Sequence, residues 1–188
     1  MAFAILRAEK LKTMGNIGGS LAHNYRTIDT PNANPSQTPN NFHSLKDSEA
    51  VKAAISERLP EKRRSDAVLC VEYMITASPE WQGWNDERQN EYFKQAVDWL
   101  EQRHGKHNVV ATSIHRDETT PHLIAYVVPL DQDTGKLNAK KFLGGKAKLA
   151  EMQSSFSNHV KNLGLKRGIE GSKAKHTRIK EYYAKVNE

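Results

Sequence analysis

The chain has 188 residues, 37% of them hydrophobic and 27% charged, which suits one domain with its own core. No apolar run approaches the ~20 residues that span a bilayer, and no cleavage site follows the apolar stretch Ala2–Leu6, so we expect no signal peptide. The single cysteine, Cys70, excludes a disulfide framework and favours a reducing compartment. We therefore expect one cytoplasmic domain over residues 1–188.

The net charge of +6 is concentrated in the C-terminal third of the chain. Residues 136–188 hold 13 Lys/Arg and 4 Asp/Glu, whereas residues 1–135 carry a small acidic excess. A basic region of this kind favours a polyanionic partner, above all nucleic acid, over a merely solvated tail.

The first 45 residues predict a strand, a short helix and a long loop. Ala2–Ala8 is typical of a strand. Gly15–Gly19 predicts a flexible turn, and Ser20 can cap a short helix that follows it. Residues 30–42 contain three prolines and four asparagines, which indicates a loop with no packed structure of its own.

The middle of the chain predicts two helices on either side of a strand. A helix over Glu49–Leu59 has its cap at Asp47 or Ser48. The strand Ala67–Thr76 is apolar on both faces apart from one acid, Glu72. A long amphipathic helix, capped by Asn85 or Asp86, runs to about His104 and ends at Gly105.

Two further strands, Val109–Ile114 and His122–Leu130, are separated by the short segment Asp117–Pro121. Strands joined by so short a loop must be antiparallel. We therefore predict an α+β domain with a mostly antiparallel central sheet and helices packed on one face. Three elements complete the chain: a hairpin turn at Asp133–Gly135 and basic helices near Lys146–Leu163 and Ser172–Val186.

The segment between these two strands places two imidazoles and two carboxylates within eight residues. Pro121 argues against a helix here. In a hairpin, His115 ends one strand, His122 opens the next, and Glu118 folds back between them. Such a ligand set with open positions suits Mn²⁺, Mg²⁺ or Zn²⁺. Asp117 is expected to orient a histidine rather than bind the metal directly.

This hairpin resembles the metal motif of the histidine–hydrophobic–histidine (HUH) endonuclease superfamily, in the variant of the plasmid mobilisation (Mob/Pre) relaxases. Residues 7–19, 23–26 and 66–73 agree with that family in order and spacing. The resemblance covers the whole chain. It implies a Mn²⁺ or Mg²⁺ site at the centre of the sheet, single-stranded DNA laid across it, and nicking and rejoining of DNA at a plasmid origin of transfer.

The resemblance also implies roles for residues outside the hairpin. Most relaxases attack DNA with a tyrosine, but the Mob/Pre type has an early histidine, which His23 matches. A neutral imidazole can attack phosphorus and leave a phosphohistidine on the 5′ end. Glu72 aligns with an acid that would accept a hydrogen bond from His23, and Arg26 is a candidate to hold the scissile phosphate. Tyr25 is the alternative nucleophile.

The family binds an origin of transfer that carries an inverted repeat, so we expect contacts with single-stranded and duplex DNA. It also has a C-terminal oligomerisation region, so we expect this sequence to be the catalytic domain of a longer, oligomeric protein. The candidate phosphate contacts are the basic residues Lys140, Lys141, Lys146, Lys148, Arg167, Lys173, Lys175 and Arg178.

Three other functions stay open at this point. A rolling-circle replication initiator of the same superfamily would use a tyrosine nucleophile. A non-catalytic DNA-binding module is favoured by Ile124, which stands where a further histidine would extend the metal site; against it, Glu118 can supply that ligand. A peptide hydrolase is disfavoured because the chain lacks a helical zinc motif and has a basic C-terminal third.

Overall fold

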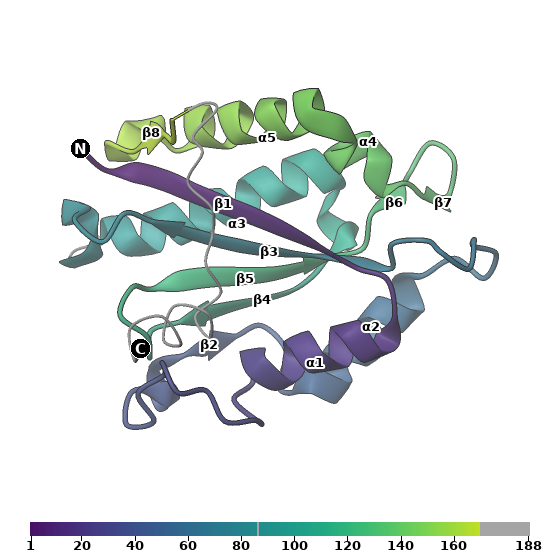
Figure 1. The fold of residues 1–188 in the computed structure, drawn as a ribbon, viewed down its shortest axis with the longest axis horizontal. Helices are drawn as coiled ribbons and strands as arrows, with labels where there is room; N and C mark the ends of the chain where they lie inside the picture. The colour runs from purple at the N-terminus through teal and green to yellow at the C-terminus, as the bar shows by residue number, and fades with distance from the viewer. Residues whose placement is uncertain (86, 170–188) are drawn as a thin grey trace, which may run out of the picture.

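The computed structural model describes residues 1–85 and 87–169, and it is built on a six-stranded sheet in the order β2-β4-β5-β3-β1-β8 (Figure 1). Neighbouring strands are antiparallel, except that β1 and β8 are parallel. The predicted α+β class with a mostly antiparallel sheet is therefore confirmed. The strands are β1 (Phe3–Leu11), β2 (Phe42–His43), β3 (Cys70–Ala77), β4 (Val109–His115), β5 (His122–Val127) and β8 (Lys166–Arg167).

Two predicted hairpins are present. The first joins β4 to β5, with His115 and His122 as the last pair in register before the turn. The second joins β6 (Leu130–Asp131) to β7 (Lys136–Leu137) and is a separate two-stranded sheet.

Helices cover both faces of the central sheet, which corrects the expectation of helices on one face only (Figure 1). The physical reason lies in the strands: β3 and β5 are apolar on both sides, and each side needs a cover. Two helices lie on one face, α1 (Met14–Asn24) and α2 (Ser48–Arg58), and three on the other, α3 (Arg88–His104), α4 (Ala139–Leu143) and α5 (Gly145–His159).

The two faces bury separate hydrophobic cores. Tyr73 of β3 packs with Trp99 of α3 and Phe156 of α5 in the larger core. Tyr126 of β5 packs with Leu21 of α1 in the smaller one. In the described part of the chain, no helix combines the length and apolar character needed to cross a bilayer.

The glycine-rich segment expected to be a turn is helical. Thr13 caps α1 by accepting a hydrogen bond from Asn16 N at 3.0 Å. Ile17 and Leu21, four residues apart on one helix face, are fully buried. Burial of these side chains against the sheet outweighs the poor helix propensity of the glycines.

The other helix ends agree with prediction in part. Asp47 caps α2, with its Oδ1 accepting from Ala50 N at 2.8 Å, and α3 ends at His104 before Gly105. However, α3 begins at Arg88 rather than directly after Asn85. Asn85 is instead the last residue of a short 3-10 helix, Gln82–Asn85. The other candidate cap, Asp86, and the predicted helix 172–186 lie outside the described residues.

Three more 3-10 helices span Thr38–Asn40, Lys106–Asn108 and Lys161–Leu163. The last of them follows α5, so the predicted helix 146–163 is an α-helix to His159 and then a separate 3-10 turn.

Candidate active site

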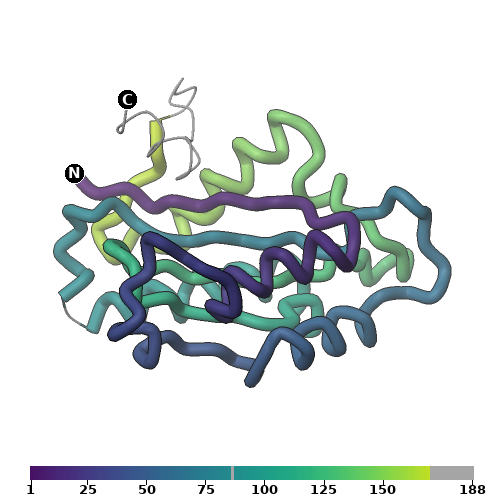
Figure 2. Tube along the Cα trace, turned by 60° about the horizontal axis from the view of Figure 1, so that its bottom comes forward, coloured from purple at the N-terminus to yellow at the C-terminus, as the bar shows by residue number. Residues whose placement is uncertain are grey.

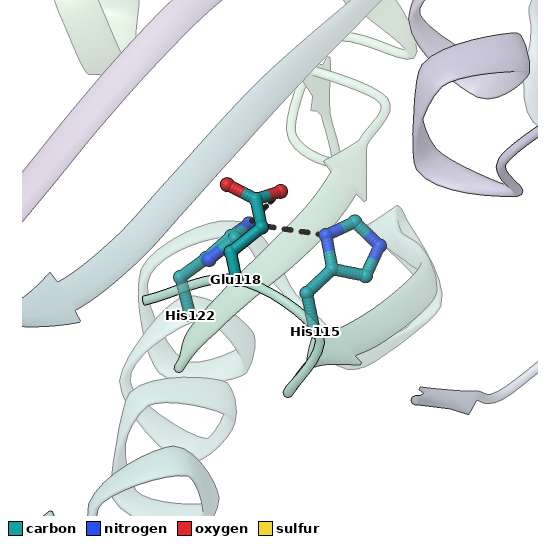
Figure 3. A group of neighbouring side chains, drawn as sticks. All are labelled: His115, Glu118 and His122. Atoms are coloured by element: carbon teal, nitrogen blue, oxygen red, sulfur yellow. Dashed lines mark hydrogen bonds and ion pairs between the residues drawn. The ribbon is translucent and has the colours of Figure 1, made fainter. Parts of the chain in front are cut away.

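Two histidines and one glutamate converge at the turn between β4 and β5 (Figure 3). Nδ1 of His115 lies 3.0 Å from Nε2 of His122, and Oε1 of Glu118 lies 3.8 Å from the same Nε2. One ligand atom from each residue falls within 4.8 Å of the other two. The predicted cluster is thus assembled by the hairpin.

The hydrogen bonds of the two imidazoles decide which nitrogens are free. Nε2 of His115 lies 2.9 Å from the carbonyl of Asn24, and Nδ1 of His122 lies 3.2 Å from that of Thr120. A carbonyl only accepts, so each of these nitrogens carries the ring's proton. In neutral rings the facing Nδ1 and Nε2, 3.0 Å apart, then both present lone pairs. Two facing lone pairs beside a carboxylate fit a divalent cation.

Burial keeps His115 in the state that a metal needs. Desolvation, aided by the neighbouring His122 and Arg26, lowers the pKa of His115 to about 3. The imidazole is therefore neutral at physiological pH, as a metal ligand must be.

Arg26 joins the two carboxylates of the turn to the end of α1. Its Nε and Nη2 donate to Asp117 at 2.9 and 2.7 Å, Nη2 also donates to Glu118 at 2.7 Å, and Nη1 donates to the carbonyl of His23 at 3.0 Å. The guanidinium expected to hold the scissile phosphate is thus already bound to carboxylates. Asp117, expected to orient a histidine, holds this arginine instead.

The Asp117 side chain is inaccessible to solvent. Burial alone would raise the pKa of this carboxyl, but hydrogen bonds from Arg26, Asn41 and Thr38 hold it well below its usual value. Asp117 is therefore a fixed anion beneath the arginine.

His23 lies in the last turn of α1 and is tied to the cluster through its backbone, because its carbonyl accepts from Arg26, which also binds Glu118. Partial burial lowers the pKa of His23, and the positive charge of Arg26 lowers it further, against the opposing effect of Glu118. The His23 imidazole is therefore within electrostatic reach of Arg26, Glu118 and His122. The imidazole is consequently neutral near pH 7 and able to act as a nucleophile.

Glu72 has a different partner from the expected one. Its Oε2 accepts a short hydrogen bond from Ser20 Oγ, which also lies 2.7 Å from the Tyr126 hydroxyl. Ser20 precedes His23 by three residues, so Glu72 holds the preceding turn of α1 rather than the imidazole itself. Burial raises the pKa of Glu72, as expected for an acid within an inner strand.

Tyr25 is turned into the packing between α1 and the edge of the sheet. Its hydroxyl donates to the carbonyl of Leu45 at 2.8 Å, and its ring stacks on His43 with centroids 4.3 Å apart. Burial raises the pKa of this phenol. These contacts hold the phenol of Tyr25 against Leu45 and His43.

The predicted phosphate contacts are divided between the two ends of the sheet. Lys140 and Lys141 lie in α4, beyond the end of β5 opposite His122 (Figure 1). Lys141 pairs with Asp131 at 2.7 Å. Lys146 and Lys148 lie in the first turn of α5, and Arg167 lies in the edge strand β8, at the cluster's end of the sheet (Figure 1). Lys173, Lys175 and Arg178 fall outside the described residues.

The loop over residues 30–42 is packed against the site, contrary to the expectation of a loop without packed structure. Asn32 Nδ2 donates to Glu118 at 2.6 Å, and Thr38 Oγ1 donates to Asp117 at 3.0 Å. The clustering of asparagines in this loop was the one available signal, and it does not specify a partner about 80 residues away in the chain.

Residues 1–184 match the profile of the family described as plasmid recombination enzyme (Mob_Pre). The chain is 36% identical to a 65 kDa protein of Zymomonas mobilis, covering 98% of this chain and 33% of that protein. It is 31% identical to a plasmid recombination enzyme of Streptococcus agalactiae, covering 97% of this chain and 39% of that protein. The chain thus spans between a third and two fifths of the length of these curated relatives.

Among solved structures, the chain is similar to the MobM relaxase domain bound to Mn and to 22 nucleotides of DNA from the origin of transfer of plasmid pMV158. The TM-score is 0.82 at 30% sequence identity, covering 97% of this chain and 99% of that domain. A complex of the same domain with 23 nucleotides gives a TM-score of 0.80. These likenesses agree with the α+β fold described above (Figure 2).

Proposed function

The chain belongs to the plasmid recombination enzyme family (Mob_Pre), and on that premise we propose that it nicks and rejoins one DNA strand at a plasmid origin of transfer. The MobM relaxase domain was solved with DNA of that kind and with Mn. The observation that carries the proposal is the cluster of three potential ligands, His115, Glu118 and His122, within electrostatic reach of His23.

His115, Glu118 and His122 are proposed to hold Mn²⁺, with Mg²⁺ as the other candidate. When bound, the cation neutralises charge on a non-bridging oxygen of the scissile phosphate. The residues around it keep the ligands in place: the carbonyls of Asn24 and Thr120 fix the imidazole tautomers.

His23 is the proposed nucleophile. Its lone pair forms a bond to phosphorus while the bond from phosphorus to the 3′ oxygen breaks. The leaving oxygen takes a proton and becomes a free 3′ hydroxyl, and the 5′ phosphate stays on the imidazole. The reverse attack by a 3′ hydroxyl restores the phosphodiester, so the reaction needs no nucleotide cofactor.

Arg26 and Glu72 are proposed to act as positioning residues. Arg26 ties the carbonyl of His23 to the acids of the metal hairpin. Glu72 holds the preceding turn of α1 through Ser20. Together they set the distance between the nucleophile and the cation.

We also propose a wider setting for the reaction. Residues 1–188 form one relaxase domain of a longer, oligomeric protein that acts on plasmid DNA in the cytoplasm and initiates conjugative mobilisation. The position of Lys140 and Lys141 in α4, at the end of the sheet away from the cluster, supports two DNA contacts, with single-stranded DNA at the cluster and an inverted-repeat hairpin on the basic surface. The proposed phosphate contacts are Lys140, Lys141, Lys146, Arg167, Lys173, Lys175 and Arg178.

The proposal is tested with single-stranded oligonucleotides that tile the DNA upstream of the gene. We expect a site-specific cut with Mn²⁺, no cut with EDTA, and no cut by His122→Ala. His107→Ala removes an exposed histidine of a 3-10 turn and should cut like the wild type. DNA binding without cutting at any metal would leave a non-catalytic binding module, and cutting by His122→Ala would exclude the proposed metal centre.

A further inference from the structure

The turn that carries Glu118 has neither helix nor strand of its own over residues 116–121. The sheet fixes His115 and His122 through their pairing in register, but it does not extend to the acid between them. A carboxylate on an irregular turn needs other contacts to be held in a ligating position. These contacts come from the loop between α1 and β2.

This loop binds the backbone of the metal turn at two points. Asn34 N donates to the carbonyl of Asp117 at 2.7 Å. The side chain of Asn41 accepts from Arg116 N, also at 2.7 Å. The path of the turn on either side of Asp117 is therefore fixed by the loop.

The loop also binds both acidic side chains of the turn. Asn32 Nδ2 donates to Oε2 of Glu118 at 2.6 Å, and Thr38 Oγ1 donates to Oδ2 of Asp117 at 3.0 Å. The other oxygen of Glu118, Oε1, is the one that lies toward His122. Asn32 on Oε2 and Arg26, which donates to Oε1 at 2.7 Å, thus together set the rotation of the carboxylate, with Oε1 toward His122.

The loop has the internal structure to serve as a support. Asn34 Oδ1 accepts from both the amide and the hydroxyl of Ser36, and Thr38–Asn40 form a 3-10 turn. Its C-terminal end continues into β2, where Phe42 pairs with Ile114, beside His115. The loop is therefore anchored to the same strand that carries the first metal ligand.

We propose that residues 32–41 are a positioning loop for the metal centre, in which Asn32, Thr38 and Asn41 preset the geometry of Glu118. The proposal rests on the metal site of the proposed function and extends it to residues outside the three potential ligands. Loss of such supporting hydrogen bonds typically weakens metal affinity about 10- to 100-fold.

The test is a Mn²⁺ titration of the purified protein without DNA, followed by electron paramagnetic resonance, which reports free and bound ion separately. We expect about 10-fold weaker binding for Asn32→Ala and for Thr38→Val. Thr38→Ser keeps the hydroxyl and should restore wild-type affinity. The matched control is Asn40→Ala, an exposed asparagine of the same loop whose amide donates to Gln37 within the loop.

Each outcome decides between the loop and the metal centre. If the wild type binds no Mn²⁺, the metal centre itself is wrong. If the wild type binds and both Asn32→Ala and Thr38→Val bind equally well, the positioning loop is wrong while the centre stands. An equal loss in Asn40→Ala would also overturn the proposal, because any damage to the loop would then suffice. If Asn32→Ala fails to fold, the comparison of Thr38→Val with Thr38→Ser still tests the proposal.

Discussion

At the scale of single residues, Arg26 contacts three other residues of the site, and its position in the sequence motif did not predict these contacts. Its guanidinium contacts Asp117, Glu118 and the carbonyl of His23. Its backbone lies in the left-handed region at φ 55, which costs about 1 kcal/mol for a residue with a Cβ. The ion pairs in the structure offset this strain.

Arg26→Gln should destabilise the metal-free protein by about 3 kcal/mol, because it leaves the buried anion of Asp117 without its partner. The measurement is the free energy of unfolding from urea denaturation in EDTA. The control is Arg64→Gln, which breaks an exposed ion pair with Asp66 and should change little. Equal stability of Arg26→Gln and the wild type would contradict the role assigned to this arginine.

The residues of the site differ in how far they could be predicted from the sequence. His115, Glu118 and His122 lie within one hairpin, so local spacing was enough to bring them together. The partners of Glu72 and Arg26 are separated from them by 52 and 91 residues. Such pairs are set by how α1 packs on the sheet, which local patterns do not encode.

At the scale of elements, α1 shows how packing overrides local propensity. Three glycines favoured a turn, yet the buried Ile17 and Leu21 hold the segment against the sheet as a helix. The same limit explains the faces of the sheet. The apolar character of β3 on both sides was visible in the sequence, but only the packed structure shows that α1 and α2 cover the second side.

Gly19→Ala should raise the free energy of unfolding by about 0.5–1 kcal/mol, because alanine is the better helix former and an added Cβ meets nothing within 4 Å. Gly105→Ala should have the opposite effect on the free energy of unfolding. Gly105 has φ 91, and its Cβ would come within 2.0 Å of Gln132 Nε2, so that variant should be destabilised. Destabilisation by Gly19→Ala would contradict a helix at this position.

His104, the last residue of α3, should make stability depend on pH. It is 3% exposed, its Nε2 lies 2.7 Å from the Tyr73 hydroxyl, and burial, with Arg103, lowers its pKa to about 3. The unfolded chain binds the proton near pH 6.5. The stability that the neutral His104 contributes is therefore fully present above that pH. It is lost as the pH falls from 6.5 toward 3, where the free energy of unfolding decreases by about 1.4 kcal/mol per pH unit.

His104→Gln should reduce the pH dependence of unfolding by about one proton between pH 6 and pH 4. Urea denaturation at several pH values in this window measures the slope. His107→Gln, which changes an exposed side chain, should keep the wild-type slope. Parallel stability curves for His104→Gln and the wild type would show that this histidine is not held neutral.

At the scale of the whole molecule, the ligand cluster and the basic helix α4 lie at opposite ends of the sheet, whereas Arg167 lies in β8 at the cluster's end. The metal hairpin and the end of α1 meet at one end of the sheet, and α4 lies beyond the other (Figures 1 and 2). The concentration of Lys and Arg in the last third was evident in the sequence, but the position of Lys140 and Lys141 at the far end of the sheet was not, because it depends on the direction of β5.

The most direct test of the central claim is the identity of the residue that becomes attached to DNA. The protein is incubated with Mn²⁺ and its cut oligonucleotide, and the adduct is digested and sequenced by mass spectrometry. We predict a phosphate on His23 in an acid-labile adduct that is absent from His23→Ala and retained in Tyr25→Phe. An acid-stable adduct on Tyr25 that survives in His23→Ala would contradict the histidine mechanism.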